Sequence, residues 1–143
     1  MKHGRASWAE LATTLGLSPP ATADRVRRLE ERGVIRGYAA LVAPEAVGRV
    51  LTAFVAVTLR GPEARVAFLA LVAELPAVQE CHHIAGDDDY LLKVRCGGTR
   101  DLEELVSDRL KGLPGVARTR TTVVLSTAKE TPALPLPPVA DGR

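Results

Sequence analysis

Aromatic residues are scarce in this chain, whose 143 residues include only one Trp, two Tyr and two Phe. Aromatics make up 3% of the sequence and hydrophobic residues 46%, so a core must be built mainly from Ala, Val and Leu. The length is sufficient for one ordinary domain or two small ones. We therefore expect a folded protein with aliphatic packing.

Membrane-spanning runs are absent as well. No apolar stretch approaches the roughly 20 residues that a transmembrane helix needs, and the first residues, MKHGRASW, lack the apolar centre of a signal peptide. The two cysteines, Cys81 and Cys96, do not have the spacing of a zinc site. We expect a cytoplasmic protein without membrane partners, in which both thiols are free and buried.

Signatures of catalysis are also missing. No Ser/His/Asp or Cys/His arrangement has a supporting local motif, and there is no phosphate-binding loop. His82 and His83 are neighbours in a predicted strand, so they point to opposite faces and cannot share one metal. We interpret both as structural, each facing a packed layer. The protein is predicted not to be an enzyme and to have no cofactor and no metal site. The alternative, a small enzyme built on the predicted sheet, is supported only by the fact that other enzymes share this kind of fold.

Charge is unevenly distributed, although the formal net charge is only +2. Residues 1–60 hold nine Lys and Arg against five Asp and Glu, and residues 61–143 hold ten against twelve. The first part therefore carries a net charge of +4 and the second −2. This modest asymmetry favours nucleic-acid contact by the N-terminal part, with oligomerisation needed to multiply the contacts.

The basic part contains the segment GLSPPATADRVRRLEERGVIRGY, residues 16–38. Gly16 ends one helix, Ser18 is a suitable N-cap for the next, and Pro19 occupies a first helical position that needs no amide donor. A helix is also predicted over residues 7–15, and a three-residue turn joins the two helices. This arrangement is typical of a helix-turn-helix.

Arginines dominate one face of the second predicted helix. Helical spacing places Thr22, Val26 and Leu29 on the inward face. The opposite side carries Ser18, Ala21, Arg25, Arg28 and Arg32, with Arg27 at its flank. A solvated charged face is the ordinary interpretation of such a stripe, but the helix-turn-helix pattern favours contact with double-stranded DNA.

The second part of the chain alternates strand and helix patterns in the order β-α-β-β-α-β, which is typical of a ferredoxin-like domain. Its first helix is expected to turn Val66, Leu69, Val72 and Ala73 inward. Two helices cover one face of such a sheet, so a homodimer is the natural way to bury the other. The predicted elements are strands over 51–60, 78–84, 90–96 and 116–126, and helices over 64–75 and 99–112.

Two further segments complete the organisation. A linker is predicted to contain a short strand over residues 38–42, which Pro44 follows, and a tail rich in proline is expected to be extended or disordered. The predicted divisions are a helix-turn-helix domain truncated at its N-terminus (1–36), a linker (37–50), an effector-binding and dimerisation domain (51–130) and a Pro-rich tail (131–143).

Three motifs resemble those of one family. They resemble motifs of the Lrp/AsnC transcription regulators of bacteria and archaea. The recognition helix and linker of that family resemble the segment GLSPPATADRVRRLEERGVIRGYAALVAPEAVG. Its strand-hairpin-strand resembles VQECHHIAGDDDYLLKV, and its last strand resembles LPGVARTRTTVVLSTAKET. The resemblance covers residues 4–131. It implies an α+β fold: an N-terminal helix-turn-helix of the winged-helix type, here with its first helix missing, and a C-terminal ferredoxin-like βαββαβ effector domain.

The resemblance also implies function. A regulator of this kind binds DNA, responds to an amino acid or related metabolite held in the C-terminal domain, and forms homodimers that assemble into octamers or similar rings. By position, the DNA-binding candidates are Ser18, Pro19, Pro20, Thr22, Arg25 and Arg28. The effector-binding candidates are Gly86, Asp87, Asp89 and Tyr90.

The start of the chain departs from the family's pattern, because family members have a further apolar and acidic helix before the position of Gly4. Our first interpretation is that the true start of the protein lies upstream of Met1. The alternatives are that another segment or subunit covers the apolar face of the two helices, or that the domain is degraded. The missing helix motivates a rival function, an effector-binding oligomer that has lost DNA binding.

The second departure is Asp88, where the family usually has an aromatic residue. Within the run Asp87-Asp88-Asp89, we expect Asp87 and Asp89 to act in the effector loop. Asp88 is expected to face solvent or to alter ligand preference. A solvated turn and a site for a hard cation are the alternatives for the whole run.

Overall fold

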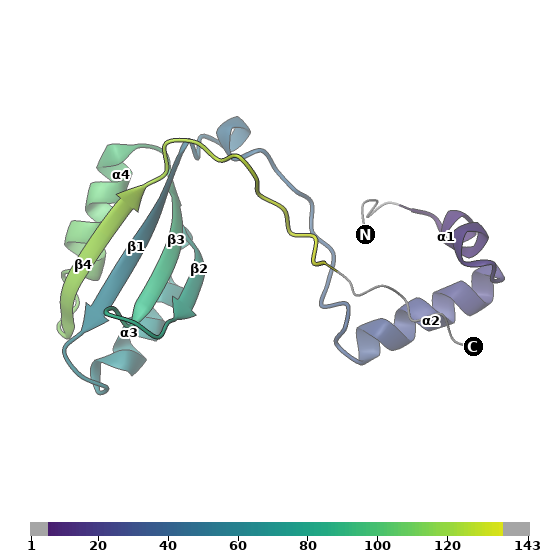
Figure 1. Cartoon of the computed structure of the whole chain (residues 1–143), viewed down its shortest axis with the longest axis horizontal. Helices are drawn as coiled ribbons and strands as arrows, with labels where there is room; N and C mark the ends of the chain where they lie inside the picture. Colours follow the sequence, from purple (N-terminus) through teal and green to yellow (C-terminus); the bar gives the residue numbers. More distant parts are fainter. Residues whose placement is uncertain (1–5, 136–143) are drawn as a thin grey trace. The chain divides into compact units, whose positions relative to one another are not determined.

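The structure is a computed structural model that describes residues 6–135. The chain divides into two compact units (Figure 1): Val42–Ala128 form one, and the residues before and after them form the other. The predicted boundaries at residues 36, 50 and 130 stay predictions. Among the described residues, no helix is long and apolar enough to cross a membrane.

The helical unit contains α1 (Trp8–Leu15) and α2 (Pro19–Glu31). Ser7 and Glu10 form a capping box at the start of α1, in which each side chain accepts a hydrogen bond from the other residue's backbone N–H. Gly16 then adopts the left-handed conformation (φ 64°), which ends α1 and opens the turn. The predicted helix-turn-helix is confirmed.

Little apolar surface is buried within the helical unit. In residues 6–41, only Ala12 and Thr22 are classed as buried. Trp8 is 49% exposed and Leu15 51%, so one apolar side of α1 has no cover within this part of the unit. The pair of helices therefore gains little of its stability from its own packing.

The predicted strand over residues 38–42 does not form. The segment has no regular structure, and a short 3-10 turn, η1 (Pro44–Val47), follows it. A strand exists only where a neighbour accepts and donates its backbone hydrogen bonds, and no described strand lies against this one. The apolar sequence alone could not supply that neighbour.

The larger unit is built on four antiparallel strands: β1 (Leu51–Leu59), β2 (Val78–His83), β3 (Tyr90–Cys96) and β4 (Val116–Val123). Their order in the sheet is β2-β3-β1-β4, which places β1 between β3 and β4. Val55 at the centre of β1 lies opposite Leu92 on one side and Thr121 on the other. This is the ferredoxin-like arrangement that the sequence predicted.

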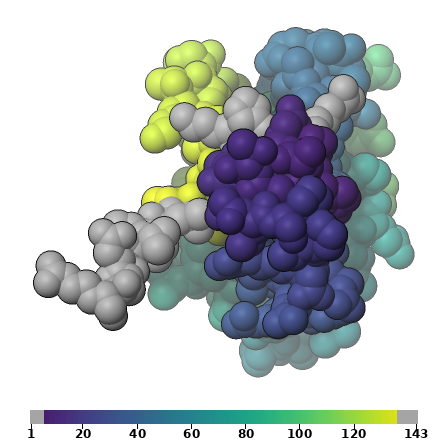
Figure 2. All heavy atoms as spheres, turned by 90° about the vertical axis from the view of Figure 1, so that its right-hand side faces the viewer, coloured from purple at the N-terminus to yellow at the C-terminus, as the bar shows by residue number. Residues whose placement is uncertain are grey.

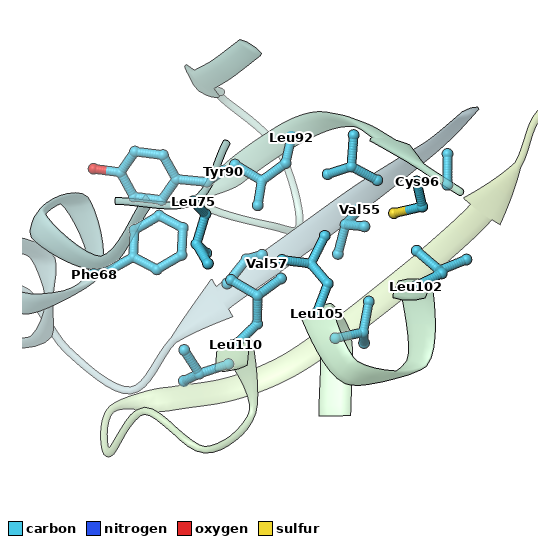
Figure 3. Packing of buried hydrophobic residues seen from close by; sticks show 14 residues of the cluster. Val55, Val57, Phe68, Leu75, Tyr90, Leu92, Cys96, Leu102, Leu105 and Leu110 are labelled. Atoms are coloured by element: carbon cyan, nitrogen blue, oxygen red, sulfur yellow. The ribbon is translucent and has the colours of Figure 1, made fainter. Parts of the chain in front are cut away.

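Helices cover one face of this sheet. α3 (Ala64–Ala73) follows β1, and α4 (Thr99–Glu103) continues into the π-helical segment η2 (Glu104–Leu110). Figure 3 shows Phe68, Leu102, Leu105 and Leu110 from these helices among the strand side chains of the core. The fully buried strand residues that meet them are Ala53, Val55, Val57, Leu92 and Val94.

The inward face predicted for α3 was right only for Val72, which packs against the core; Val66, Leu69 and Ala73 are exposed. Val66 is 79% exposed and Leu69 38%, whereas Phe68 is fully buried and Ala64 nearly so. The helix sequence ARVAFLALVA is apolar almost all round, so its periodicity does not select a face. The largest side chain, Phe68, enters the core instead.

The second face of the sheet, here called the open face, carries no helix among the described residues of this unit. Strand alternation and register assign to it the residues between those of the core. They are Thr52, Phe54, Ala56 and Thr58 on β1, Leu91, Lys93 and Arg95 on β3, Glu80 and His82 on β2, and Arg118, Arg120 and Thr122 on β4.

Phe68→Ala is predicted to destabilise the protein by about 3–5 kcal/mol, because it removes a fully buried ring from the centre of the core. Val66→Ala in the same helix serves as the matched control and should change the free energy of unfolding by less than about 0.5 kcal/mol. Urea unfolding of both variants measures this. A larger loss for Val66→Ala would restore the original assignment of the helix faces.

Candidate functional site

The arginine face of α2 is exposed along its length. Ser18, Ala21, Arg25, Arg28 and Arg32 are all exposed, and Figure 2 shows α1 and α2 as one continuous surface, purple to dark blue. Ser18 caps the helix by accepting a hydrogen bond from the Ala21 N–H at 3.4 Å. Pro19 and Pro20 lie exposed in the first turn beside it.

Thr22 differs from the other DNA-binding candidates because it is fully buried. Its hydroxyl donates a hydrogen bond to the Ser18 carbonyl oxygen at 3.0 Å. This hydrogen bond stabilises the first turn of α2, and the buried side chain does not reach the surface. Thr22 is therefore placed to orient the helix.

The arginines of α2 differ in their partners. Asp24 accepts from both Arg27 and Arg28, and Arg27 also reaches Glu31 at 3.2 Å. The hydrogen bond from Arg27, with the nearby charge of Arg28, lowers the pKa of the Asp24 carboxyl. All these side chains are substantially exposed, so the ion pairs contribute little stability and exchange readily for a phosphate. No described residue forms an ion pair with Arg25.

Sequence reasoning missed a contact at the end of α2. The Tyr38 hydroxyl donates to Glu30 Oε1 at 2.7 Å, and this hydrogen bond raises the pKa of Tyr38. The contact ties the first residues of the linker to the last turn of the helix. An aromatic residue eight positions after a glutamate gives no periodic signal in the sequence, so only coordinates reveal the pair.

The predicted effector loop was residues 86–90; in the structure residues 84–89 join β2 to β3, and Tyr90 is the first residue of β3. Gly86 and Asp87 are exposed at its tip, and no described group pairs with the Asp87 carboxylate. The loop closes on itself through a hydrogen bond of 2.9 Å from the Ile84 N–H to the Asp89 carbonyl oxygen. Its tip is therefore open to a ligand while its base is held.

Asp89 fixes this loop to the end of β1. Its carboxylate accepts from the Leu59 N–H at 2.7 Å, and its own N–H donates to the Val57 carbonyl oxygen at 3.0 Å. Both bonds use backbone groups just before the strand ends. Asp89 is thus committed within the chain and is placed to position the loop.

Asp88 lies where we did not expect it, since its side chain is 3% exposed and does not face solvent. Its carboxylate accepts from Thr58 Oγ1 at 2.8 Å, from Arg118 at 3.2 Å and from Arg120 at 2.6 Å. The hydrogen bond from Thr58, followed by the guanidinium groups of Arg120 and Arg118, holds the pKa of this carboxyl below its usual range. Strand pairing causes this, because Thr58 lies opposite Arg118 on the open face.

Tyr90 belongs to the core. It is 3% exposed and packs between Phe68 and His83, with ring centroids 4.8 Å and 5.1 Å away. In Figure 3 its hydroxyl points away from the other labelled side chains, and this buried oxygen has no hydrogen-bond partner among residues 6–135. Of the four effector-binding candidates, the structure thus brings Gly86 and Asp87 to the surface and uses Asp89 and Tyr90 for support.

The described histidines, His82 and His83, and the two cysteines lie outside the predicted sites. His82 and His83 are both exposed, which corrects the expectation that each faces a packed layer; the His82 ring lies 3.0 Å from Glu80, and this contact lowers the pKa of the Glu80 carboxyl. Burial raises the pKa of the thiols of Cys81 and Cys96, which are free. In residues 6–135, no group of three or more His, Cys, Asp or Glu side chains is placed to hold a metal ion.

Comparison with known proteins identifies the family. The model of the Lrp/AsnC ligand binding domain matches residues 52–134, more than half of the chain, and a winged helix-turn-helix DNA-binding model matches residues 1–36. The chain belongs to the Lrp/AsnC family. It is therefore a DNA-binding transcriptional regulator and not an enzyme, as the sequence predicted.

Relatives of known function and of known structure support this family membership. The HTH-type transcriptional regulator LrpA of Mycobacterium tuberculosis is 45% identical over 87% of this chain and 81% of its own length. The regulator NMB0573 of Neisseria meningitidis, solved with L-Met, is 35% identical, with a TM-score of 0.88 over 92% of this chain and 86% of that one. The feast or famine regulatory protein Rv3291c of M. tuberculosis, solved with L-methionine, is 43% identical, with a TM-score of 0.84 over 92% and 88%.

Asp88→Asn is predicted to lower stability at neutral pH but not in strong acid. Because folding depresses the pKa of this carboxyl, its contribution is present above the unfolded value of about 3.9 and is lost as the pH falls through the folded value. Urea unfolding between about pH 7 and pH 2 should show wild type and variant converging.

Asp87→Asn is the matched control, since Asp87 is exposed and unpaired among the described residues. Its difference from wild type should stay small across the same pH range. A pH-independent deficit in Asp88→Asn would mean that packing, and not charge, makes that residue important.

Proposed function

We propose that this Lrp/AsnC regulator reads DNA with the first turns of α2 and responds to an amino acid or a related metabolite at the tip of loop 84–89. The observation that carries the proposal is the exposed arginine face of α2, which continues from an open, Ser18-capped N-terminus. Recognition helices place such a terminus at the base edges of the major groove. The regulator would act in the cytoplasm, where its DNA target lies.

Base reading and phosphate contact fall to different residues in this proposal. Ser18, Pro19 and Pro20 occupy the helix end that enters the groove, where they shape contact with base edges. Arg25 and Arg28, further along the same face, would bind phosphates and set the register. Thr22 supports them from the buried side.

A second copy of the chain is the proposed occupant of the open face. Phe54 is 37% exposed there, next to Ala56 in β1, and Leu91 lies opposite Ala56. Pairing two such faces would cover this apolar centre, in which Ala56 is already buried but Phe54 and Leu91 are not, and would present two reading helices to a pseudo-palindromic site. Further assembly into an octamer or similar ring, which the family resemblance implies, would add contacts to compensate for the modest basic charge.

Asp87 is the group proposed to bind the effector's ammonium. It is exposed, is unpaired among the described residues and lies beside Gly86, where a Cβ would meet no atom within 4 Å. A ligand therefore has room against the Gly86 backbone. The L-methionine complexes of relatives solved with that ligand support an amino acid as the effector class.

A second candidate function is an effector-binding oligomer that no longer binds DNA. The exposed apolar side of α1, with Trp8 49% and Leu15 51% exposed, favours it because a poorly braced helix pair reads DNA badly. A gel shift against the gene's own upstream region, with calorimetry on amino acids, separates the two functions. Retained amino-acid binding without a sequence-dependent shift would select the second.

Arg25→Ala and Arg28→Ala are each predicted to weaken DNA binding across many sequences, because each removes one phosphate contact. The slope of log affinity against log salt should fall by about 1 in each variant. Arg100→Ala is the matched control, since it removes one exposed positive charge from α4 and should leave the slope unchanged. An unchanged slope for Arg25→Ala or Arg28→Ala would remove that residue from the phosphate contacts.

Asp87→Asn is predicted to weaken amino-acid binding by about ten- to a hundredfold, the effect of losing one charge-assisted hydrogen bond. Calorimetry with L-methionine measures it, and methionine lacking a free ammonium should bind wild type and variant equally weakly. Asp108→Asn, an exposed carboxylate in η2, is the control. Equal affinities of wild type and Asp87→Asn would place the ammonium elsewhere.

A further inference from the structure

The open face carries an excess of positive charge. Four basic side chains lie on it against two acidic ones. The basic residues are Lys93 and Arg95 on β3 with Arg118 and Arg120 on β4, and the acidic ones are Glu80 on β2 and Asp88 from the loop. When two copies of such a face meet, like charges are brought together at low dielectric, which opposes association.

Asp88 counters this charge at one place. Its carboxylate accepts from Arg118 through one oxygen and from Arg120 through the other, so both guanidinium groups are held on one carboxylate. The two arginine side chains remain 58% and 63% exposed, whereas that of Asp88 is 3% exposed. The acid is therefore beneath the arginines, at the edge of the apolar centre formed by Phe54, Ala56 and Leu91.

The loop makes this carboxylate rigid. Asp89 next to it is bonded to the backbone of Val57 and Leu59, and Tyr90 after it is buried in the core. Thr58 holds the Asp88 carboxylate from β1 as well. A fixed acid can orient two long side chains at little entropic cost, because it does not itself have to be ordered on association.

We propose that Asp88 is a positioning residue for self-association: it holds Arg118 and Arg120 along the open face and cancels part of their charge, so that a second copy of the same face can dock. A variant of this chain with a neutral residue at position 88 would present both Arg118 and Arg120 uncompensated and would pair poorly with itself.

The placement also connects ligand and assembly. Asp88 lies between Asp87, the proposed ammonium contact, and Asp89, which anchors the loop. A ligand that shifts the loop tip would shift the carboxylate that orders the docking face. Effector affinity and self-association are then linked, and each changes the other by the same factor.

The inference rests on the proposed self-association through the open face, and one set of variants tests the two separately. Sedimentation equilibrium at about 50 mM and about 0.5 M salt compares wild type, Asp88→Asn, Arg118→Gln/Arg120→Gln and the triple variant. Asp88→Asn should weaken self-association about tenfold or more at low salt and much less at high salt. The triple variant should recover to within about threefold of wild type, because no uncompensated arginine remains.

Two outcomes overturn the inference: self-association of Asp88→Asn equal to wild type, or a loss that is the same at both salts and is not rescued in the triple variant. Circular dichroism checks that each variant is folded. If Asp88→Asn is unfolded, the triple variant still tests the charge argument, because the triple variant should be folded and should self-associate. Phe54→Asp tests the face itself. If Phe54→Asp associates like wild type, the open-face dimer is wrong, whatever Asp88 does.

Discussion

Everything in the larger unit depends on the register of β1 between β3 and β4. That pairing sends Ala53, Val55 and Val57 into the core and their neighbours Phe54, Ala56 and Thr58 to the open face. A slip of one residue would exchange the two sets and leave the helices without a core. The same register brings the end of β1 against the loop before β3 and against β4. The aliphatic core and the candidate site are thus consequences of one set of backbone hydrogen bonds.

The three consecutive aspartates show how strongly position within this frame decides function. Asp87 stays at the surface, Asp88 is buried against two arginines, and Asp89 accepts from the Leu59 N–H of β1 and donates to the Val57 carbonyl oxygen. Their chemistry is identical, and only the strand ends around them differ. The proposed ligand contact, the proposed role in assembly and the observed anchoring of the loop therefore lie within three residues. A ligand at Asp87 would act close to the face proposed for self-association, so the proposed coupling between them needs no long path.

Much of the fold was predictable because local signals were strong. Turn residues bracket every strand of the sheet, and the pattern β-α-β-β-α-β followed from them; β3 was predicted at its observed bounds. Ser18 and Pro19 marked the start of α2 for the same reason. The failures occurred where the local signal was uniform or incomplete. Helix α3 is apolar all round, so Val66 was assigned to the wrong face, and residues 38–42 had strand composition but no neighbouring strand.

The sequence by itself determined the element order, the exposed arginine face of α2 and the membership of the Lrp/AsnC family, because these depend on spacing and motif along the chain. The tertiary structure alone decided the partners of Asp88 and the contact of Tyr38 with Glu30. It also decided that Tyr90, which the motif places in the effector loop, supports the loop from the core. The physical reason is that a side chain's environment is set by strands and loops that are distant in sequence and that come together only when the sheet forms.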